Sequence, residues 1–122
     1  MNHKDLMVWQ LSVDLSVAVY RATRSFPSEE KFGLVSQMRR AAVSIPSNIA
    51  EGAARSSRKE FQQFLSIAGG SASELSTQLI ISNRAGLLGR QAAEDLDKQL
   101  EQVTRLLHGL ARSVGEAKAS KA

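Results

Sequence analysis

The residues of this sequence best suited to chemistry are the basic ones between positions 21 and 60. This stretch holds eight Lys and Arg against four Asp and Glu, an excess equal to the net charge of +4 of the whole chain. Most of these bases are arginine, whose planar guanidinium can bind phosphate in a bidentate way. We predict that five of them bind nucleic acid: Arg39, Arg40, Arg55, Arg58 and Lys59. Arg21 and Arg24 would extend this set.

The same basic stretch has a plainer interpretation as a solvated face held by ion pairs. The sequence shows neither aromatic residues interleaved with the bases nor a known groove-reading motif. Phosphate binding and a structural charged face therefore both stay open at this point.

The sequence contains few residues that could bind a metal ion or take part in catalysis. The chain contains no cysteine, which excludes disulfides, cysteine zinc sites, iron–sulfur clusters and thiol nucleophiles. Its two histidines are His3 and His108, and the residue three before His108 is Arg105, so the Glu-x-x-His pair of di-iron bundles is missing. No G-x-S-x-G elbow occurs. We expect no catalytic residue, no cofactor and no metal site, and a protein that is not an enzyme.

Apolar residues recur at steps of three and four, the spacing of a helix face, in four segments. The first helix is predicted over about 5–25 and stops at Phe26-Pro27, and its stripe is Leu6, Trp9, Val13, Val17 and Tyr20. The second begins at Ser28 and reaches Gly52, with the stripe Leu34, Met38, Ala41, Ile45 and Ile49.

The last two helices have clear start and stop signals. Ser57 and Glu60 form the S-x-x-E pattern of a capping box, and Gly86 marks the end of the third helix. The third stripe is Phe61, Phe64, Leu65, Ala68, Ala72, Leu75 and Leu79. The fourth is Leu96, Leu100, Val103, Leu107, Leu110 and Val114.

Two helix interiors break the ordinary pattern. Pro46 either ends or kinks the second helix, and we favour a kink because the stripe resumes at Ile49. We expect Ser44 and Asn48 to satisfy carbonyls freed by the proline, and Glu51 to pair with Arg55. Glycines 69 and 70 in the third helix predict close approach of a neighbouring helix, with a ligand approaching the backbone as the alternative.

These elements predict the all-α class, as an antiparallel up-down-up-down four-helix bundle with the second helix kinked near Pro46. Residues 1–115 would form a single domain and 116–122 a disordered tail. No apolar run is long enough to cross a bilayer and the N-terminal pattern is not that of a signal peptide. We expect a cytoplasmic protein with no membrane contact.

The segments QMRRAAVSIPSNIAEG (37–52) and FLSIAGGSASEL (64–75), together with Trp9 and Tyr20, closely resemble a known bacterial family. It is the family of four-helix-bundle proteins named for their genes, which lie in intervening sequences of 23S rRNA genes. The resemblance covers about two thirds of the chain and carries over no catalytic residue.

The resemblance implies a ring of antiparallel bundles, expected to be a homopentamer. Accessory proteins of diversity-generating retroelements look similar, and those are basic pentameric barrels that bind nucleic acid and a reverse transcriptase. The expectation is a non-enzymatic oligomer that binds RNA or DNA, structured RNA or a ribonucleoprotein above all, through a basic face of the second helix. The alternative is a ring-shaped scaffold or adaptor that binds a protein partner and no nucleic acid.

Overall fold

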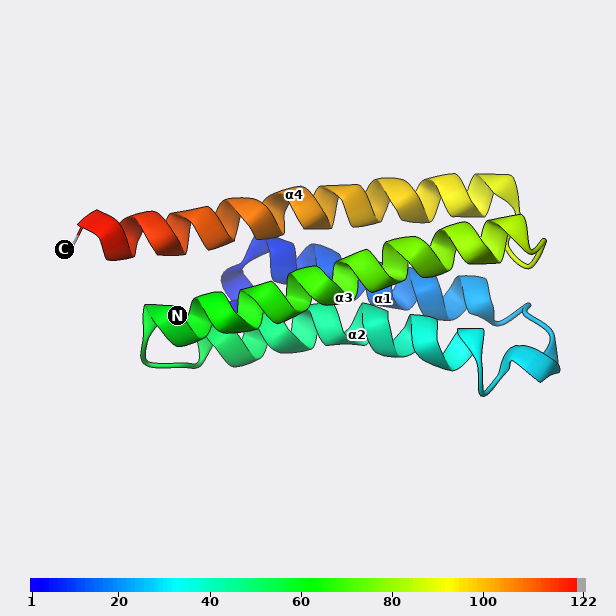
Figure 1. Ribbon diagram of the computed structural model, residues 1–122, viewed down its shortest axis with the longest axis horizontal. Helices are drawn as coiled ribbons and strands as arrows, with labels where there is room; N and C mark the ends of the chain where they lie inside the picture. The colour runs from blue at the N-terminus through cyan, green and yellow to red at the C-terminus, as the bar shows by residue number, and fades with distance from the viewer. Residues whose placement is uncertain (121–122) are drawn as a thin grey trace.

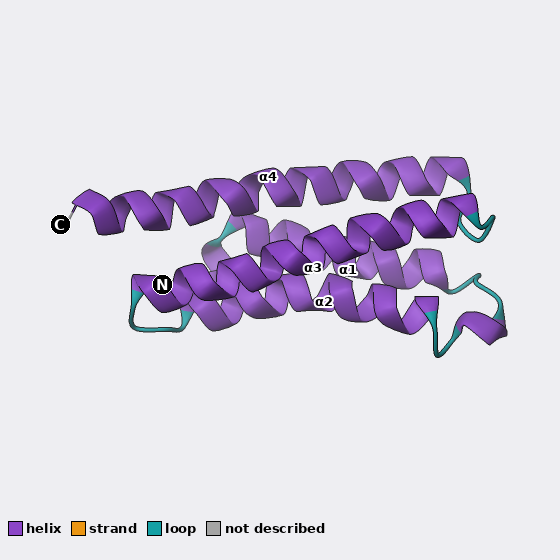
Figure 2. Cartoon of the chain, viewed as in Figure 1, coloured by secondary structure: helices purple, strands orange, loops and turns teal. Residues whose placement is uncertain are grey.

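The computed structural model describes residues 1–120, which form four α-helices joined by short loops (Figures 1 and 2). The helices are α1 (Met7–Thr23), α2 (Leu34–Ala53), α3 (Arg58–Arg84) and α4 (Arg90–Ser120). The 3₁₀ turns η1 (His3–Asp5) and η2 (Ser28–Glu30) precede α1 and α2. No strand occurs in this range, so the predicted all-α class is confirmed.

The four helices pack as one bundle. Each helix contacts the next one along the chain, and α4 also packs against α1. In Figure 1 the connections 24–33 and 85–89 lie at one end of the bundle, and the connection 54–57 lies at the other. The bundle itself is thereby confirmed, whereas the up-down-up-down order and the kink near Pro46 stay predictions.

The stripes predicted for α2, α3 and α4 form most of the core. Their members are buried except for three that are half-buried: Leu34, Phe64 and Leu110. Met38, Ile45, Ile49, Leu75 and Leu107 are among the largest side chains that are fully enclosed. Helical periodicity therefore identified the inward faces of these three helices correctly.

The stripe predicted for α1 is correct only at its start, where Leu6 and Trp9 pack half-buried against the core, and is wrong in its second half. Val17 and Tyr20 keep 43% and 42% of their surface exposed, and the face that is buried carries three hydroxyl side chains. Its members are Val8, Ser12, Leu15, Ser16, Val19 and Thr23. Ser12 donates a hydrogen bond to the Trp9 carbonyl (2.9 Å) and Thr23 to the Val19 carbonyl (2.8 Å). Because these hydroxyls are satisfied by the preceding turn, burying them costs little.

Helix α2 continues through Pro46 as far as Ala53. Proline has no N–H, so the carbonyl of Ala42 loses its donor within the helix. The Ser16 hydroxyl of α1 lies 3.0 Å from that carbonyl oxygen and 2.9 Å from the Ser12 carbonyl oxygen, so its single hydrogen is shared between the two. Asn48 instead donates to the Ser44 carbonyl at 2.8 Å. The expectation that Ser44 or Asn48 would serve the freed carbonyl is therefore wrong, because the donor comes from the neighbouring helix.

We expect Ser16→Ala to lower the free energy of unfolding by about 1–3 kcal/mol, because the buried Ala42 carbonyl would be left without a donor. Pro46→Ala restores an N–H at position 46. The cost of Ser16→Ala should therefore fall below about 1 kcal/mol in that background. Urea unfolding of the two single variants and the double variant gives the coupling. Strictly additive costs would refute this account of Pro46.

The ends of α3 match the sequence signals. The Ser57 hydroxyl oxygen accepts from the Glu60 N–H (3.1 Å), so the predicted helix start with Ser57 as N-cap is confirmed. The Glu60 carboxylate accepts from the Ser57 hydroxyl (3.2 Å). Gly86 has φ +78°, and the Leu87 N–H bonds back to the Ser82 carbonyl at 2.9 Å. This hydrogen bond is that of a Schellman motif, which ends α3.

Two helix boundaries differ from those predicted. The segment at Ser28 forms only the turn η2, and α2 begins at Leu34, after Gly33 leaves the helical region with φ −106° and ψ −110°. Helix α4 continues through Gly115 to Ser120, because the residues there, mainly Ala, Lys and Glu, favour a helix. The domain boundary at 115 stays a prediction, and residues 121 and 122 of the predicted tail lie outside the described part.

Close backbone approach occurs at a different glycine from the pair that we expected. A Cβ atom added at Gly69 or Gly70 would meet nothing within 4 Å, so the predicted helix contact there is wrong. At Gly52, an added Cβ would lie 2.8 Å from Cδ1 of Phe61 and 2.9 Å from Cβ of Phe64. The glycine that lets two helices come together is therefore Gly52, where α2 meets α3.

Candidate nucleic-acid interface

The surface between α1 and α2 carries a basic groove. It consists of two adjoining hollows of about 560 and 410 Å³, which share Tyr20 and Val43. We call it the α1–α2 groove, and its residues are Val13, Ser16, Val17, Tyr20, Arg21, Arg24, Lys31, Phe32, Val35, Ser36, Arg39, Arg40, Val43, Ser44 and Pro46. Five of these side chains are cationic and none is a carboxylate. The charged side chains that line the groove are therefore all positive.

Arg39 is held in place by α1. Its Nε donates to the Thr23 hydroxyl oxygen at 3.0 Å, and its Nη2 donates to the Tyr20 carbonyl at 3.3 Å. The guanidinium also lies 4.5 Å from the centroid of the Tyr20 ring. These contacts occupy part of the guanidinium and leave further N–H donors. Arg39 thus joins α1 to α2 and presents a fixed positive charge at the groove.

The other bases of the groove are less constrained. The Arg40 side chain is exposed and makes no hydrogen bond or ion pair with any residue that the structure describes. Lys31 is exposed, and its Nζ lies 5.4 Å from the centroid of the Phe32 ring. Arg21 on α1 and Arg24 directly after it are exposed and line the same hollow as Tyr20. Four flexible cations therefore surround the fixed Arg39.

The predicted binding residues fall into two groups. Arg39 and Arg40 lie in the groove, whereas Arg55, Arg58 and Lys59 lie at the connection 54–57, where α2 meets α3. Thirteen helical residues separate Arg40 from the end of α2, a distance of about 20 Å along the axis. The sequence stretch is continuous, but the five side chains do not converge on one site.

The second group is more engaged within the protein. Arg55 makes the predicted ion pair with Glu51 at 3.3 Å, and its guanidinium lies 4.9 Å from the Phe64 ring centroid. Arg58 is half-buried and has a polar or ring contact of its own. Lys59 is exposed. Arg55 and Arg58 fit the structural interpretation of the charge better than Arg40 does.

Sequence reasoning missed the aromatic side chains of the groove. Tyr20 was assigned to the core, and Phe32 was not assigned to any face, yet both line the same hollow as Arg39 and Arg40. Lys31 also lies there. Phe32 lies directly beside Lys31 in the chain, and that adjacency was the signal that could have found the pair.

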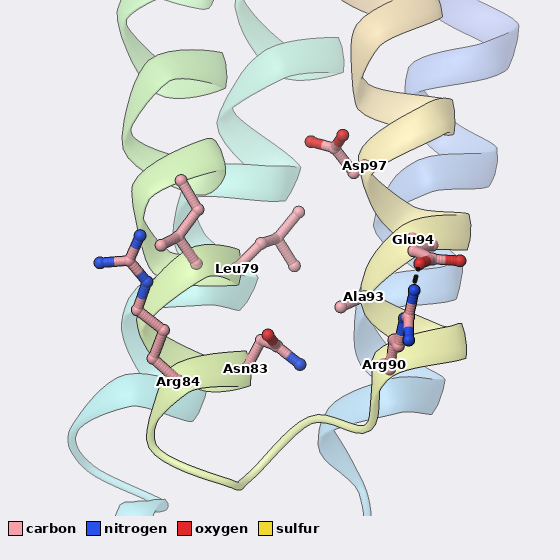
Figure 3. Close-up of a pocket in the computed structure, with 8 residues that line it drawn as sticks. Leu79, Asn83, Arg84, Arg90, Ala93, Glu94 and Asp97 are labelled. Atoms are coloured by element: carbon pink, nitrogen blue, oxygen red, sulfur yellow. Dashed lines mark hydrogen bonds and ion pairs between the residues drawn. The ribbon is translucent and has the colours of Figure 1, made fainter.

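Other hollows on the bundle carry compensated charge. Figure 3 shows one of about 490 Å³ near the α3–α4 turn, where Arg90 is bonded to Glu94 on the same helix at 3.1 Å. Arg84 and Asp97 also line it. A further hollow includes Asp97 and Glu101. Another adjoins the groove, because it is lined by Arg40 and Ser44 together with Glu74. The α1–α2 groove as defined is lined by bases without acids, and Glu74 belongs to the neighbouring hollow that shares Arg40.

Side chains of catalytic type are scattered. His108 is exposed on α4, and the His3 ring packs edge-on to Trp9 with centroids 5.1 Å apart. Over the residues described, no three His, Asp or Glu side chains are grouped so that they could hold a metal ion. No helix within 1–120 has the length and hydropathy needed to cross a membrane.

Comparison with known proteins identifies the family of this chain. A solved structure, described as a protein of unknown function from the S23 ribosomal protein family of Bacteroides thetaiotaomicron, has a similar fold with a TM-score of 0.78. The two share 24% identity, and the match covers 86% of this chain and 98% of that one. Comparison with curated proteins finds no similar sequence. The family model for the 23S rRNA-intervening sequence protein matches residues 4–109, so the chain belongs to that family.

Proposed function

We propose that this protein is a non-enzymatic, oligomeric helical bundle of the cytoplasm that binds nucleic acid along the α1–α2 groove. The observation that carries the proposal is the five cations that line the groove with no carboxylate among them. Structured RNA, free or in a ribonucleoprotein, is the ligand that we favour over DNA.

The binding mechanism is phosphate neutralisation. Arg40 and Lys31 are exposed on long stems, so their charged ends can follow a phosphate backbone. Arg39 supplies a charge whose position is already fixed by Thr23 and Tyr20, which reduces the entropy lost on binding. Displacing counterions from the phosphates then drives association.

Oligomerisation would strengthen this binding, and we propose a homopentamer. Three isoleucines on α3, Ile67, Ile80 and Ile81, each expose about half of their surface (52%, 50% and 49%) and offer apolar contacts between copies. Five chains of net charge +4 would carry a total of about +20. A modest groove repeated around a ring would thus attract a polyanion strongly.

We expect the wild-type protein to bind a fluorescently labelled structured RNA at low salt and to lose affinity steeply as salt rises. With up to five phosphates neutralised per groove, raising the salt from about 50 to about 200 mM should weaken binding by about 100-fold. Fluorescence anisotropy measures both constants. Failure to bind any structured or duplex RNA at low salt would end the proposal.

The second candidate is a ring-shaped scaffold for a protein partner. The exposed isoleucines of α3 favour it, because an apolar surface of this kind can also bind another protein. A pull-down after nuclease treatment separates the two functions. A partner that survives nuclease, combined with no RNA affinity, would replace nucleic-acid binding by the scaffold.

A further inference from the structure

Phe32 is the most exposed large apolar side chain recorded for this bundle. It keeps 88% of its surface exposed, against 42% for Tyr20 and about half for the isoleucines of α3. Phe32 stands between η2 and α2, and its ring forms part of the α1–α2 groove. The protein thus holds a bare aromatic ring in water at the edge of its most basic surface.

The surroundings of the two groove rings are cationic. The Arg39 guanidinium lies 4.5 Å from the Tyr20 centroid, and Lys31 Nζ lies 5.4 Å from the Phe32 centroid. The hollow that contains both rings has a volume of about 560 Å³, which is within the range of sites for small organic ligands. Aromatic rings beside cations along a groove are the combination that binds single-stranded nucleic acid, because bases stack while phosphates are neutralised.

We infer that the α1–α2 groove takes unpaired nucleotides, with a base stacked on Phe32 and the flanking phosphates on Lys31 and Arg40. This inference rests on the proposed function and narrows its ligand. In a duplex the base faces are already stacked on one another, so Phe32 has nothing to contact there. Contacts to phosphates carry no information about the bases, whereas stacking on Phe32 requires an exposed base face. Phe32 therefore gives the groove its preference for loops, bulges and single-stranded ends.

The positive charge of the groove favours nucleic acid, and not a second copy of this chain, as its ligand. A groove with five cations and no carboxylate is complementary to a polyanion. A copy of this protein carries a net charge of +4 itself. Burying the groove against it would bring like charges together unless an acidic face were presented.

The test uses three labelled probes in anisotropy titrations at low salt: a short single-stranded RNA, an abasic strand of the same length and charge, and a blunt RNA duplex. The variants are Phe32→Ala and Phe32→Trp, and Met7→Ala is the control because Met7 is an exposed apolar residue that lies outside the groove and is not one of the α3 isoleucines. Phe32→Ala should weaken binding of the single strand by about tenfold and leave the abasic strand and the duplex within about twofold. Phe32→Trp should keep the affinity, and its added indole emission should be quenched by the single strand only.

Three other results would contradict the inference, each in a different way. If the wild type binds the single strand and the abasic strand equally, base stacking is overturned while phosphate binding stands. If no probe binds at low salt, the proposed function fails together with this inference. If Phe32→Ala dissociates an oligomer, as light scattering would show, and leaves the single-strand affinity unchanged, Phe32 contacts protein and the inference is wrong.

Discussion

Gly52→Ala is expected to destabilise the protein by about 1–3 kcal/mol, as overpacked sites do. The added methyl group would lie 2.8 Å from Cδ1 of Phe61, 2.9 Å from Cβ of Phe64 and 3.3 Å from the Phe61 carbonyl oxygen. Two of these three atoms belong to the Cβ position or backbone of α3 and cannot rotate away. Relief therefore requires α2 and α3 to separate, and this cost should exceed the gain of about 1 kcal/mol in helix propensity.

Gly70→Ala is the matched control, because Gly70 also lies inside a helix but an added Cβ there meets nothing within 4 Å. This variant should be more stable than wild type by about 0.5–1 kcal/mol. Urea unfolding of both variants at one protein concentration measures the two changes. If Gly52→Ala were as stable as Gly70→Ala, the close approach of α2 and α3 would be refuted.

The second large effect is expected from reversing charge in the groove. The double variant Lys31→Glu/Arg40→Glu should bind structured RNA about 100-fold more weakly at low salt, because two phosphate contacts are lost and two repulsions are added. Both side chains are exposed. Arg39 is left unchanged because it donates hydrogen bonds to Thr23 and Tyr20. Replacing it would disturb the packing of α1 on α2, so a loss of binding could not be assigned to charge alone.

The control for this variant is Lys98→Glu/Arg112→Glu. It changes the net charge by the same amount, at two exposed positions of α4 outside the groove. Its affinity should fall by less than about fivefold, since distant exposed charges are screened by salt. Equal losses in the two double variants would mean that total charge, and not the groove, governs binding.

The inward faces of α2, α3 and α4 could be predicted from the sequence because in each helix one regular series of apolar residues at steps of three and four is buried, while the apolar residues off that series, such as Ile67 and Ile80, are exposed. In α1 the periodicity was ambiguous. Apolar residues lie on two faces, and the buried face includes Ser16 and Thr23, whose hydroxyls are satisfied by backbone carbonyls. No propensity or hydropathy scale favours burying such residues, since the contacts that permit it are formed only after folding.

The candidate site was predicted in part. Counting charge along the chain located Arg39 and Arg40, but joined them to Arg55, Arg58 and Lys59, which lie at one end of the bundle. Proximity in sequence misleads here, because each helical residue adds about 1.5 Å along the axis. Tyr20 on α1 and Phe32 in the connection 24–33 line the same hollow. The two rings come close only when α1 packs against α2, so their proximity could not be predicted from helical periodicity.

The most direct test of the central claim is the salt dependence of RNA binding by wild type and by Lys31→Glu/Arg40→Glu. The slope of the logarithm of the binding constant against the logarithm of salt concentration reports how many phosphates are neutralised. If the α1–α2 groove is the interface, the slope of the double variant should be shallower by about 1.5 to 2 units, and that of Lys98→Glu/Arg112→Glu unchanged. Identical slopes and affinities for wild type and Lys31→Glu/Arg40→Glu would contradict the claim that nucleic acid binds in this groove.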